Sequence, residues 1–274
     1  MSLEFQQESG GEPESQPLQP ALSVVVPAYN EERTLAGVVN KLLLVPGLSE
    51  IVIVDDASSD KTYEIATRLA REYEQVRVLR QPQNCGKTAA LRAGIAATRG
   101  EIVLIQDADY EYDSAEIPDL IQPIVDGVAD AVYGSRFLVR KAARVLYFNH
   151  YLANKVLTFL SNVFTNVNLS DVETGYKAFR GEVIRKMNLT ATGFGFEIEV
   201  TAKLAKLRCA LYEVPISYYG RTYEEGKKIL AKDAFAALWF IFKYNLFCNL
   251  KSSFHSLPLS RDHEERDIGT AQQE

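Results

Sequence analysis

Residues 101 to 113, Glu-Ile-Val-Leu-Ile-Gln-Asp-Ala-Asp-Tyr-Glu-Tyr-Asp, determine how the rest of the chain is interpreted. The apolar run at 102–105 is rich in β-branched residues, which predicts a strand that is buried on both faces. It ends at Asp107 and Asp109. In an open α/β sheet, ligands bind in the crevice beyond the carboxyl ends of the strands. Two carboxylates there can hold one hard cation, Mg²⁺ or Mn²⁺, together with phosphate oxygens.

Asp is also common in solvated turns, so the acidic pair alone does not decide between a turn and a metal site. The surrounding elements favour a site, because they alternate between strand and helix. Strands are predicted at 22–26, 50–54, 76–79, 102–105 and 129–133, and helices at 31–44, 61–74, 88–98 and 114–126. Asn30 is the expected N-cap of the first helix. This order predicts an α/β protein with a mostly parallel sheet flanked by helices.

The second half of the chain adds two long helices with apolar faces. Helix 147–166 carries a stripe at helical spacing, made of Phe148, Leu152, Val156, Phe159, Leu160, Val163 and Val167. Helix 229–247 carries another, made of Phe235, Leu238, Trp239, Phe242 and Leu246. Such stripes pack into a core, contact a lipid surface or contact a partner subunit. Between these helices we expect a turn and strand at 171–180, a helix at 197–207 and two short strands around Pro215.

Both ends of the chain are polar and acidic. Residues 1–20 hold four Glu and no Lys or Arg, and residues 255–274 hold five acidic residues and two Arg. We therefore expect disordered tails at 1–20 and 255–274 around a folded domain at 21–254. The whole chain has a net charge of −6, of which the tails contribute −4 and −3, so the domain is close to neutral at +1. An acidic total therefore does not argue against binding phosphates or an anionic membrane.

Cysteine usage and hydropathy predict a cytoplasmic protein. The three cysteines, Cys85, Cys209 and Cys248, have no spacing typical of a disulfide framework or a zinc site. No stretch has the pattern of a signal peptide, and the longest apolar stretch, 234–250, is interrupted and shorter than the ~20 residues that span a bilayer. Basic residues are not gathered into one run, so we expect no nucleic-acid partner.

Two common phosphate-binding motifs are absent. Gly86-Lys87-Thr88 suggests a P-loop, but position 81, where that motif needs Gly, is Gln. The first strand is followed by Pro27 and Tyr29, with no dinucleotide-binding glycine pattern. Lys87 is then a cation at a helix start, which either faces the site or is solvated. The loop at 220–228 is better suited to clamp a diphosphate, because it combines three cations with two glycines.

A series of motifs, in this order, resembles family 2 glycosyltransferases of GT-A fold: 27–32, 54–62, 84–87, 107–109, 134–137 and 174–179. Within that family the chain is similar to dolichol-phosphate (polyprenyl-phosphate) mannosyl- and glucosyltransferases over nearly all of 21–250. The resemblance implies a GT-A (Rossmann-like) domain with C-terminal amphipathic helices. It also implies metal-dependent, inverting transfer of a hexose from a nucleotide sugar, of the GDP-mannose or UDP-glucose type, to a polyprenyl (dolichyl) phosphate.

The resemblance further implies roles for individual residues. It assigns binding of the nucleotide sugar to Pro27, Tyr29, Glu31, Val54, Asp55, Asp56, Lys87, Asp107, Ala108, Asp109, Arg136, Lys177, Arg221 and Lys227. It assigns Mg²⁺ or Mn²⁺ to Asp107, Asp109 and Glu111, although several relatives have Gln at the third position. It assigns catalysis to Asp107, Asp109, Arg136, Arg221 and Lys227.

The chemistry of these residue types agrees with such a transfer. Breaking a bond between sugar C1 and a nucleoside diphosphate requires the charge of the leaving group to be neutralised, which a metal ion and a Lys/Arg loop supply. A phosphate acceptor is already ionised near neutral pH and needs cations rather than a general base. The alternative is a family 2 enzyme that uses a hydroxyl of a soluble or protein-bound acceptor. It would require a carboxylate base, for which Asp171 and Glu197 are the candidates.

The expected partners are a nucleotide-sugar donor and a lipid-phosphate acceptor at the cytoplasmic face of a membrane. Because no transmembrane region follows the catalytic domain, the helices at 147–166 and 229–247 and the basic loop with Arg140, Lys141 and Arg144 would contact the membrane. A homodimer or a membrane subunit is the competing partner for these helices. Outside enzymes of this family, a regulatory module that binds sugar nucleotides is disfavoured by the intact acidic pair. A nucleotidyltransferase is disfavoured because no Gly-rich loop follows the first strand.

Overall fold

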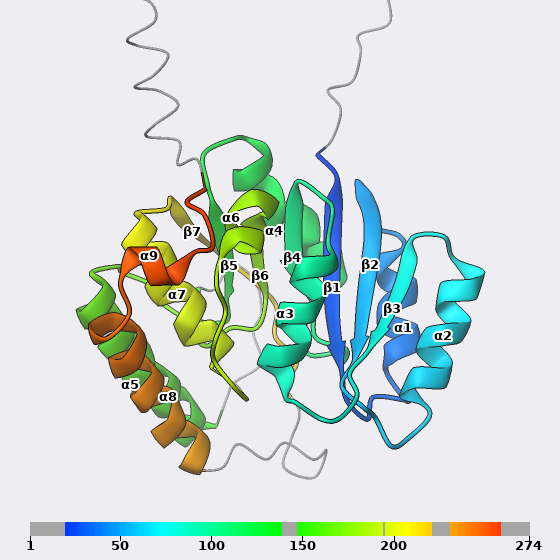
Figure 1. Cartoon of the computed structure of the whole chain (residues 1–274), viewed down its shortest axis with the longest axis horizontal. Coiled ribbons are helices and arrows are strands. Elements are labelled where there is room, and N and C mark those ends of the chain that lie inside the picture. Colours follow the sequence, from blue (N-terminus) through cyan, green and yellow to red (C-terminus); the bar gives the residue numbers. More distant parts are fainter. Residues whose placement is uncertain (1–19, 139–146, 194, 221–230, 259–274) are drawn as a thin grey trace, which may run out of the picture.

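Seven strands form one sheet among the residues that the computed structural model describes, which are 20–138, 147–193, 195–220 and 231–258 (Figure 1). In order across the sheet they are β3 (Val76–Arg80), β2 (Leu48–Asp55), β1 (Leu22–Ala28), β4 (Ile102–Ile105), β6 (Lys177–Arg180), β5 (Ala131–Ser135) and β7 (Leu211–Pro215). All neighbours pair in parallel except β6, which is antiparallel to β4 and β5. The expected mostly parallel α/β sheet is confirmed.

Strand order reverses between β1 and β4, which lie side by side at the centre of the sheet. Val25 of β1 pairs with Ile105 of β4, and Val26 pairs with Ile53 of β2 on the other side. Strands β2 and β3 are added on one side of β1, whereas β4 and the strands after it are added on the other side. A reversal of this kind separates the loops above the strand ends and leaves a crevice between them. The acidic pair follows β4 at this point.

Helices cover both faces of the sheet, as the alternating order predicts. On one face, α1 (Leu35–Leu42), α2 (Thr62–Glu72) and α4 (Ile117–Val125), preceded by the short η1 (Ser114–Glu116), enclose one apolar core with the sheet. On the other face, α3 (Lys87–Ala97), α6 (Gly181–Lys186) and α7 (Phe196–Leu207) enclose a second core. β4 contributes alternate residues to the two cores, Ile102 and Leu104 to the first and Val103 and Ile105 to the second. This strand is therefore buried on both faces, as expected.

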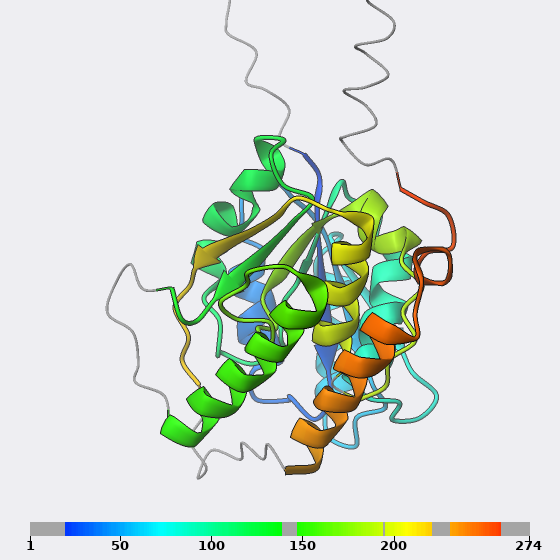
Figure 2. The same cartoon turned by 90° about the vertical axis from the view of Figure 1, so that its left-hand side faces the viewer.

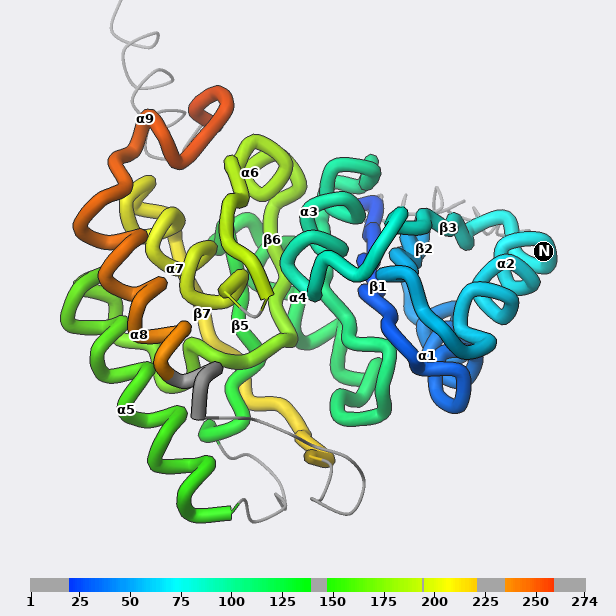
Figure 3. The backbone as a smooth tube through the Cα atoms, turned by 60° about the horizontal axis from the view of Figure 1, so that its bottom comes forward, coloured from blue at the N-terminus to red at the C-terminus, as the bar shows by residue number. Residues whose placement is uncertain are grey.

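Two helices lie outside α7 and run side by side (Figure 2). They are α5 (Phe148–Thr165) and α8 (Ala231–Leu246), which is followed by the short α9 (Leu250–Ser253). Figure 3 places this pair and α2 at opposite ends of the molecule. None of the helices in the described ranges is long and apolar enough to cross a membrane.

The structure differs from the sequence expectations at several element ends. Helix α1 begins at Leu35 rather than at residue 31, because the preceding turn is bonded to the loop after β2. Asn30 does not cap the helix: its backbone has φ 56° and its Oδ1 accepts a hydrogen bond from the N–H of Ser59 at 2.8 Å. One strand, rather than two, adjoins Pro215, and α6 and α9 were not expected. The first residue of the expected C-terminal tail contacts the domain, since the N–H of His255 donates a hydrogen bond to the carbonyl of Lys186.

Candidate active site

The site begins at the carboxyl end of β4, where Asp107 and Asp109 follow the strand. Asp109 is buried, and its Oδ1 accepts a hydrogen bond from the N–H of Glu111 at 3.0 Å. The Asp107 side chain is 21% exposed, and its Oδ1 lies 2.8 Å from the Nζ of Lys87. A local hydrogen bond thus holds one carboxylate in the loop, while the other remains accessible beside a cation.

Lys87, the first residue of α3, faces the site. Its Nζ also lies 3.4 Å from Oε1 of Glu197 at the start of α7. Burial opposes the charge on this ammonium group, but the neighbouring Asp107 and Glu197 raise the pKa of Lys87 above its ordinary value. Lys87 is therefore charged at neutral pH. The sequence left open whether Lys87 faces the site or is a solvated surface residue, and the structure favours the first interpretation.

Gly175 fits closely against this ion pair. Its N–H donates to the hydroxyl of Tyr112 at 2.9 Å. A Cβ at this position would lie 2.8 Å from Oδ2 of Asp107 and 3.2 Å from Nζ of Lys87. The backbone at Gly175 therefore packs directly on the ion pair of Asp107 and Lys87, and a side chain there would displace these two groups.

The expected metal set is only partly assembled. The Oε2 of Glu111 accepts a hydrogen bond from the hydroxyl of Tyr218 at 2.8 Å. Within the described ranges, no three His, Cys, Asp or Glu side chains are grouped so that they could hold a metal ion. The assignment of Glu111 as a third ligand therefore stays a prediction. Asp107 and Asp109 remain as oxygen donors of the type that Mg²⁺ and Mn²⁺ bind, and Mg²⁺ is commonly held by one or two carboxylates plus phosphate oxygens.

The acidic residues after β2 hold the neighbouring loops in place. Asp56 is buried and accepts hydrogen bonds from the N–H groups of Cys85 and Gly86, both at 2.8 Å. Asp55 is fully buried; its Oδ1 accepts from the N–H of Ser58 at 3.3 Å, and its Oδ2 lies 3.2 Å from Nε of Arg80. Asp56 thus fixes the loop before α3, and Asp55 joins the loop after β2 to the end of β3.

The other residues expected around the nucleotide lie along the same edge. Tyr29 is half-exposed, and Glu31 accepts a hydrogen bond from the hydroxyl of Thr34 at 2.8 Å. Pro27 pairs with Val54 across β1 and β2, and the side chain of Val54 is buried beneath α3. Ala108 is buried between the two carboxylates. These residues line or support one wall of the crevice, and their contacts with a nucleotide remain a prediction.

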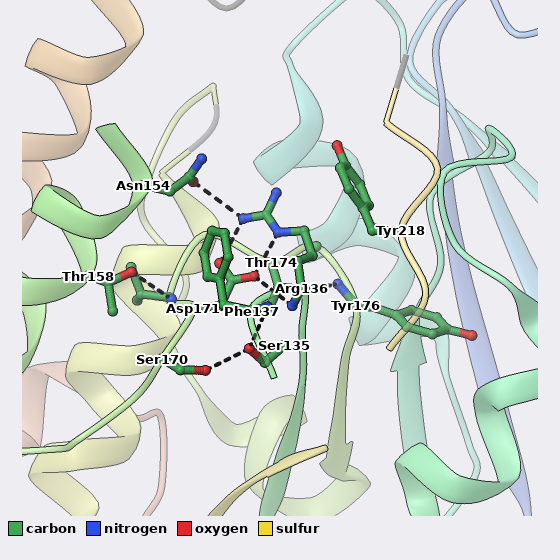
Figure 4. Close-up of polar contacts among 12 residues, drawn as sticks. Ser135, Arg136, Phe137, Asn154, Thr158, Ser170, Asp171, Thr174, Tyr176 and Tyr218 are labelled. Atoms are coloured by element: carbon green, nitrogen blue, oxygen red, sulfur yellow. Dashed lines mark hydrogen bonds and ion pairs between the residues drawn. The ribbon is translucent and has the colours of Figure 1, made fainter. Parts of the chain in front are cut away.

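Arg136, directly after β5, is held by Asp171 in the arrangement drawn in Figure 4. Its Nε and Nη2 lie 2.7 Å from Oδ2 and Oδ1 of Asp171, and its backbone N–H donates to the same carboxylate at 3.1 Å. Nη2 also donates to Oδ1 of Asn154 on α5 at 3.3 Å. The guanidinium carbon lies 5.2 Å from the ring centre of Tyr218. Because Asp171 is fully buried and uses both oxygens, it is unsuited to act as a general base.

A second buried cluster lies beneath the site. Lys177 is fully buried, and its Nζ donates to the carbonyls of Val172, at 2.9 Å, and Thr174. Burial lowers the pKa of Lys177 to about 8, and burial raises the pKa of Glu173 to about 7 with a further contribution from Glu197. In this structure Lys177 is fully buried and is bonded to the turn at 172–174. The resemblance had implied that it contacts the nucleotide sugar, and that contact stays a prediction.

Three aromatic residues connect these parts and were not predicted from the sequence. Tyr112 stacks on Tyr176, with ring centres 4.8 Å apart, and contacts Tyr218, with ring centres 5.5 Å apart. An isolated bridge joins the backbones of Tyr112 and Tyr218. Two of them could have been found from their positions in the sequence. Tyr112 lies three residues after Asp109, and Tyr176 lies inside the motif at 174–179. Tyr218 had no signal of its own.

Several residues named from the sequence lie outside the described ranges. These are the loop cations Arg140, Lys141 and Arg144, and the clamp residues Arg221 and Lys227. The described part of the site consists of the acidic pair with Lys87, the wall after β1 and β2, and Arg136 with its partners. Carboxylates and cations of these types are the groups that bind a metal-chelated diphosphate and other anions in proteins.

The chain is similar to known glycosyltransferases. The family model described as glycosyl transferase family 2 matches residues 23–187. Undecaprenyl-phosphate mannosyltransferase of Micrococcus luteus is 30% identical over 213 residues, which cover 74% of this chain and 85% of that protein. Polyprenol monophosphomannose synthase of Mycolicibacterium smegmatis is 31% identical over 226 residues, which cover 80% of this chain and 84% of that protein.

A solved structure shares the fold. The crystal structure of glucosyl-3-phosphoglycerate synthase from Mycobacterium tuberculosis with Mn²⁺, uridine diphosphate and glucosyl-3-phosphoglycerate superposes with a TM-score of 0.64. The two chains are 21% identical, and the superposition covers 86% of each. At this identity the likeness establishes the GT-A architecture alone. With the family model and the two relatives, the chain belongs to glycosyltransferase family 2 and is an enzyme that transfers sugars.

Proposed function

We propose that this enzyme transfers a hexose, with inversion, from a nucleotide sugar of the GDP-mannose or UDP-glucose type to a polyprenyl (dolichyl) phosphate. The observation that carries the proposal is the pair Asp107 and Asp109 at the strand reversal, beside the charged Lys87 and across the site from Arg136. The relatives from Micrococcus luteus and Mycolicibacterium smegmatis are named for transfer of mannose to lipid phosphates, which supports the choice of acceptor.

The donor end of the site supplies the groups that the reaction needs. When bound, Mg²⁺ or Mn²⁺ would neutralise the diphosphate that leaves from the sugar, and Asp107 and Asp109 would hold it. Lys87 adds a positive charge 2.8 Å from Asp107 and so lies within reach of the same phosphates. Its charge is fixed near neutral pH, so it would stabilise the leaving group without a proton transfer.

The acceptor end suits an anion better than a hydroxyl group. A hydroxyl acceptor needs a carboxylate base, but Asp171 is bound on both oxygens by Arg136, and Glu197 faces Lys87. A phosphate acceptor needs no base, and Arg136 lies in a fixed position at this end. These contacts favour the lipid-phosphate reaction over the alternative with a soluble or protein-bound hydroxyl acceptor.

Exposed apolar surface next to the site offers a way to reach a lipid. Helices α5 and α8 begin on the side of the molecule where β1 and β4 end (Figures 1 and 2). On α5, Phe148 is 71% and Phe159 65% exposed, and on α8, Phe235 is 71% and Trp239 59% exposed. Exposed apolar side chains gathered on neighbouring helices are typical of an interaction site. We propose that it contacts the cytoplasmic face of a membrane, with a homodimer as the competing occupant.

A transfer assay tests the proposal. The purified chain would be incubated with radiolabelled GDP-mannose or UDP-glucose, a short-chain polyprenyl phosphate in neutral detergent, and Mg²⁺, Mn²⁺ or EDTA. We expect label in the lipid fraction with a metal ion and none with EDTA. Asp107→Asn should lower the rate by at least ~10²-fold, as loss of one preorganised charge group does, while Asp119→Asn on the exposed face of α4 should not. Transfer only to hydroxyl acceptors would refute the proposal and support the alternative.

A further inference from the structure

Lys155 on α5 is a cation beside Arg136 to which neither the sequence motifs nor the proposed function assigns a role. Its Nζ lies 4.2 Å from the ring centre of Phe137 and 5.7 Å from that of Tyr151. The guanidinium carbon of Arg136 lies 5.7 Å from the same Phe137 ring. Phe137 and Tyr151 themselves pack edge to face, with ring centres 5.3 Å apart. The two cations are therefore neighbours that share one aromatic contact.

These neighbouring cations differ in how their charge is compensated. Arg136 forms a bidentate ion pair with the fully buried Asp171, so the pair as a whole is close to neutral. Lys155 donates one hydrogen bond, to the carbonyl of Ser170 at 3.1 Å. Among the described residues no carboxylate lies within ion-pair distance of its Nζ. In the described part of the acceptor end, the net positive charge thus comes from Lys155.

Lys155 also lies at the border between the site and the exposed apolar surface. Residues three and four apart on a helix share a face, so Lys155 continues the line of Phe148, Tyr151 and Leu152. These three side chains are 71%, 40% and 48% exposed. A lysine at such a border can lay its apolar stem along the surface and keep its ammonium group at the polar edge. A molecule with an apolar chain and one phosphate matches this arrangement, because its chain would contact the apolar side chains and its phosphate would reach the ammonium group.

Helix α5 is fixed to the site by polar contacts on its inner side, which positions Lys155. Asn154 accepts from Arg136, Thr158 Oγ1 accepts from the N–H of Val172 at 3.2 Å, and Asn162 bonds both backbone groups of Leu169. The segment from Leu169 to Val172 also carries Asp171, which holds Arg136. These hydrogen bonds therefore hold the ammonium group of Lys155 and the guanidinium group of Arg136 in fixed positions relative to each other.

We infer that Lys155 binds the phosphate of the lipid acceptor and makes the enzyme selective for an ionised, lipid-borne acceptor. The inference rests on the proposed function and adds a residue to it. A phosphate monoester carries a charge of about −1.5 to −2 near neutral pH. The neutral Arg136–Asp171 pair supplies directed N–H groups, and Lys155 supplies the uncompensated charge.

Steady-state kinetics of Lys155→Met and Lys155→Arg test the inference, with the acceptor in neutral detergent micelles so that no anionic lipid contributes. Lys155→Met keeps the apolar stem and removes the charge. We expect its KM for the prenyl phosphate to rise about tenfold or more, the effect of losing one charge-assisted hydrogen bond, while its KM for the donor stays unchanged. Lys155→Arg should retain most of the acceptor affinity. The matched control is Lys251→Met, on the exposed side of α9.

Each outcome is informative. If Lys155→Met has the same acceptor KM as Lys251→Met in neutral detergent, the inference is wrong. Equal increases in the donor and acceptor KM, or a lowered unfolding temperature that Lys155→Arg shares, would assign Lys155 a structural role and also overturn it. A wild-type enzyme that transfers no sugar to prenyl phosphate would remove the proposed function itself, which separates the two failures.

Discussion

At the residue scale, Asp171 binds Arg136 through both carboxylate oxygens, which leaves it unsuited to act as a general base. The acidic pair Asp107 and Asp109 was predictable, because it follows an apolar run whose burial on both faces is evident from composition. The sequence suggested Asp171 as a candidate general base, but in the structure it binds Arg136, which lies 35 residues earlier in the chain. Such a pairing depends on β6 lying between β4 and β5, a topology that local periodicity does not encode.

Gly175 gives a prediction about the geometry of the acidic pair. In Gly175→Ala, the new Cβ would meet the Oδ2 of Asp107 at 2.8 Å and the Nζ of Lys87 at 3.2 Å. Both atoms end flexible side chains, so they can move away and the fold should survive. We expect transfer activity to fall about tenfold or more, because small displacements of a catalytic group are costly. The unfolding temperature should change little, and a large decrease in it would contradict this explanation.

Glu173 gives a prediction about pH. Burial raises its pKa from the ordinary 4.5 to about 7, so between these values the folded protein holds a proton that the unfolded chain has released. Stability from this group is therefore lost as pH rises through that window. The negative charges of Glu197 and Asp171 also raise the pKa of Glu173, whereas the positive charges of Lys177 and Arg136 lower it.

Glu173→Gln removes this titration and keeps the shape of the side chain. We expect the free energy of unfolding of the variant, relative to the wild type, to increase between pH 4.5 and 7 by on the order of 1–3 kcal/mol. Urea denaturation at several pH values measures it. Parallel curves for the two proteins across this window would mean that Glu173 is already ionised at pH 4.5 in the folded state.

At the scale of elements, the hydrophobic periodicity predicted helices α5 and α8, but it did not predict whether their apolar faces are buried or exposed. The stripe on α5 was compatible with core packing or with an exposed face, since the spacing is the same in both cases. The structure buries the opposite side of the helix and leaves Phe148, Phe159 and Val163 exposed. The inner side of α5 carries Asn154, Thr158 and Asn162, whose hydrogen bonds to distant loops were not visible in the sequence.

This exposed face gives a prediction about membrane contact. Phe159→Glu combined with Trp239→Glu places charges on residues that are 65% and 59% exposed, so the fold should be retained. We expect sedimentation with anionic liposomes to decrease several-fold, because both apolar contact and charge attraction are lost. The matched control is Leu44→Glu, which changes a residue that is 82% exposed on the α1 side of the molecule. Unchanged liposome binding together with loss of a dimer would identify a second subunit as the occupant.

At the scale of the whole molecule, the distribution of charge bears on the proposed contact with a membrane surface. The chain has a net charge of −6, but residues 1–19 contribute −4 and residues 259–274 contribute −3, which leaves +1 for residues 20–258. Long-range attraction to an anionic membrane depends on the charge that the surface meets, and exposed charges act over roughly 8–10 Å at physiological salt. The acidic ends therefore oppose the approach of the nearly neutral domain to such a surface.

Removing residues 1–19 and 259–274 should strengthen binding to anionic vesicles, because the remaining chain no longer carries the excess of acidic residues. The gain should disappear at high salt, where exposed charges are screened, and should be absent with vesicles of neutral phosphatidylcholine. Transfer to a prenyl phosphate in neutral detergent should be unchanged, because the groups described in the site all lie between residues 20 and 258. Liposome sedimentation and the detergent assay on the same two proteins measure these effects separately. Equal vesicle binding by the full and shortened chains would mean that local contacts of α5 and α8, and not the overall charge, govern association with the membrane.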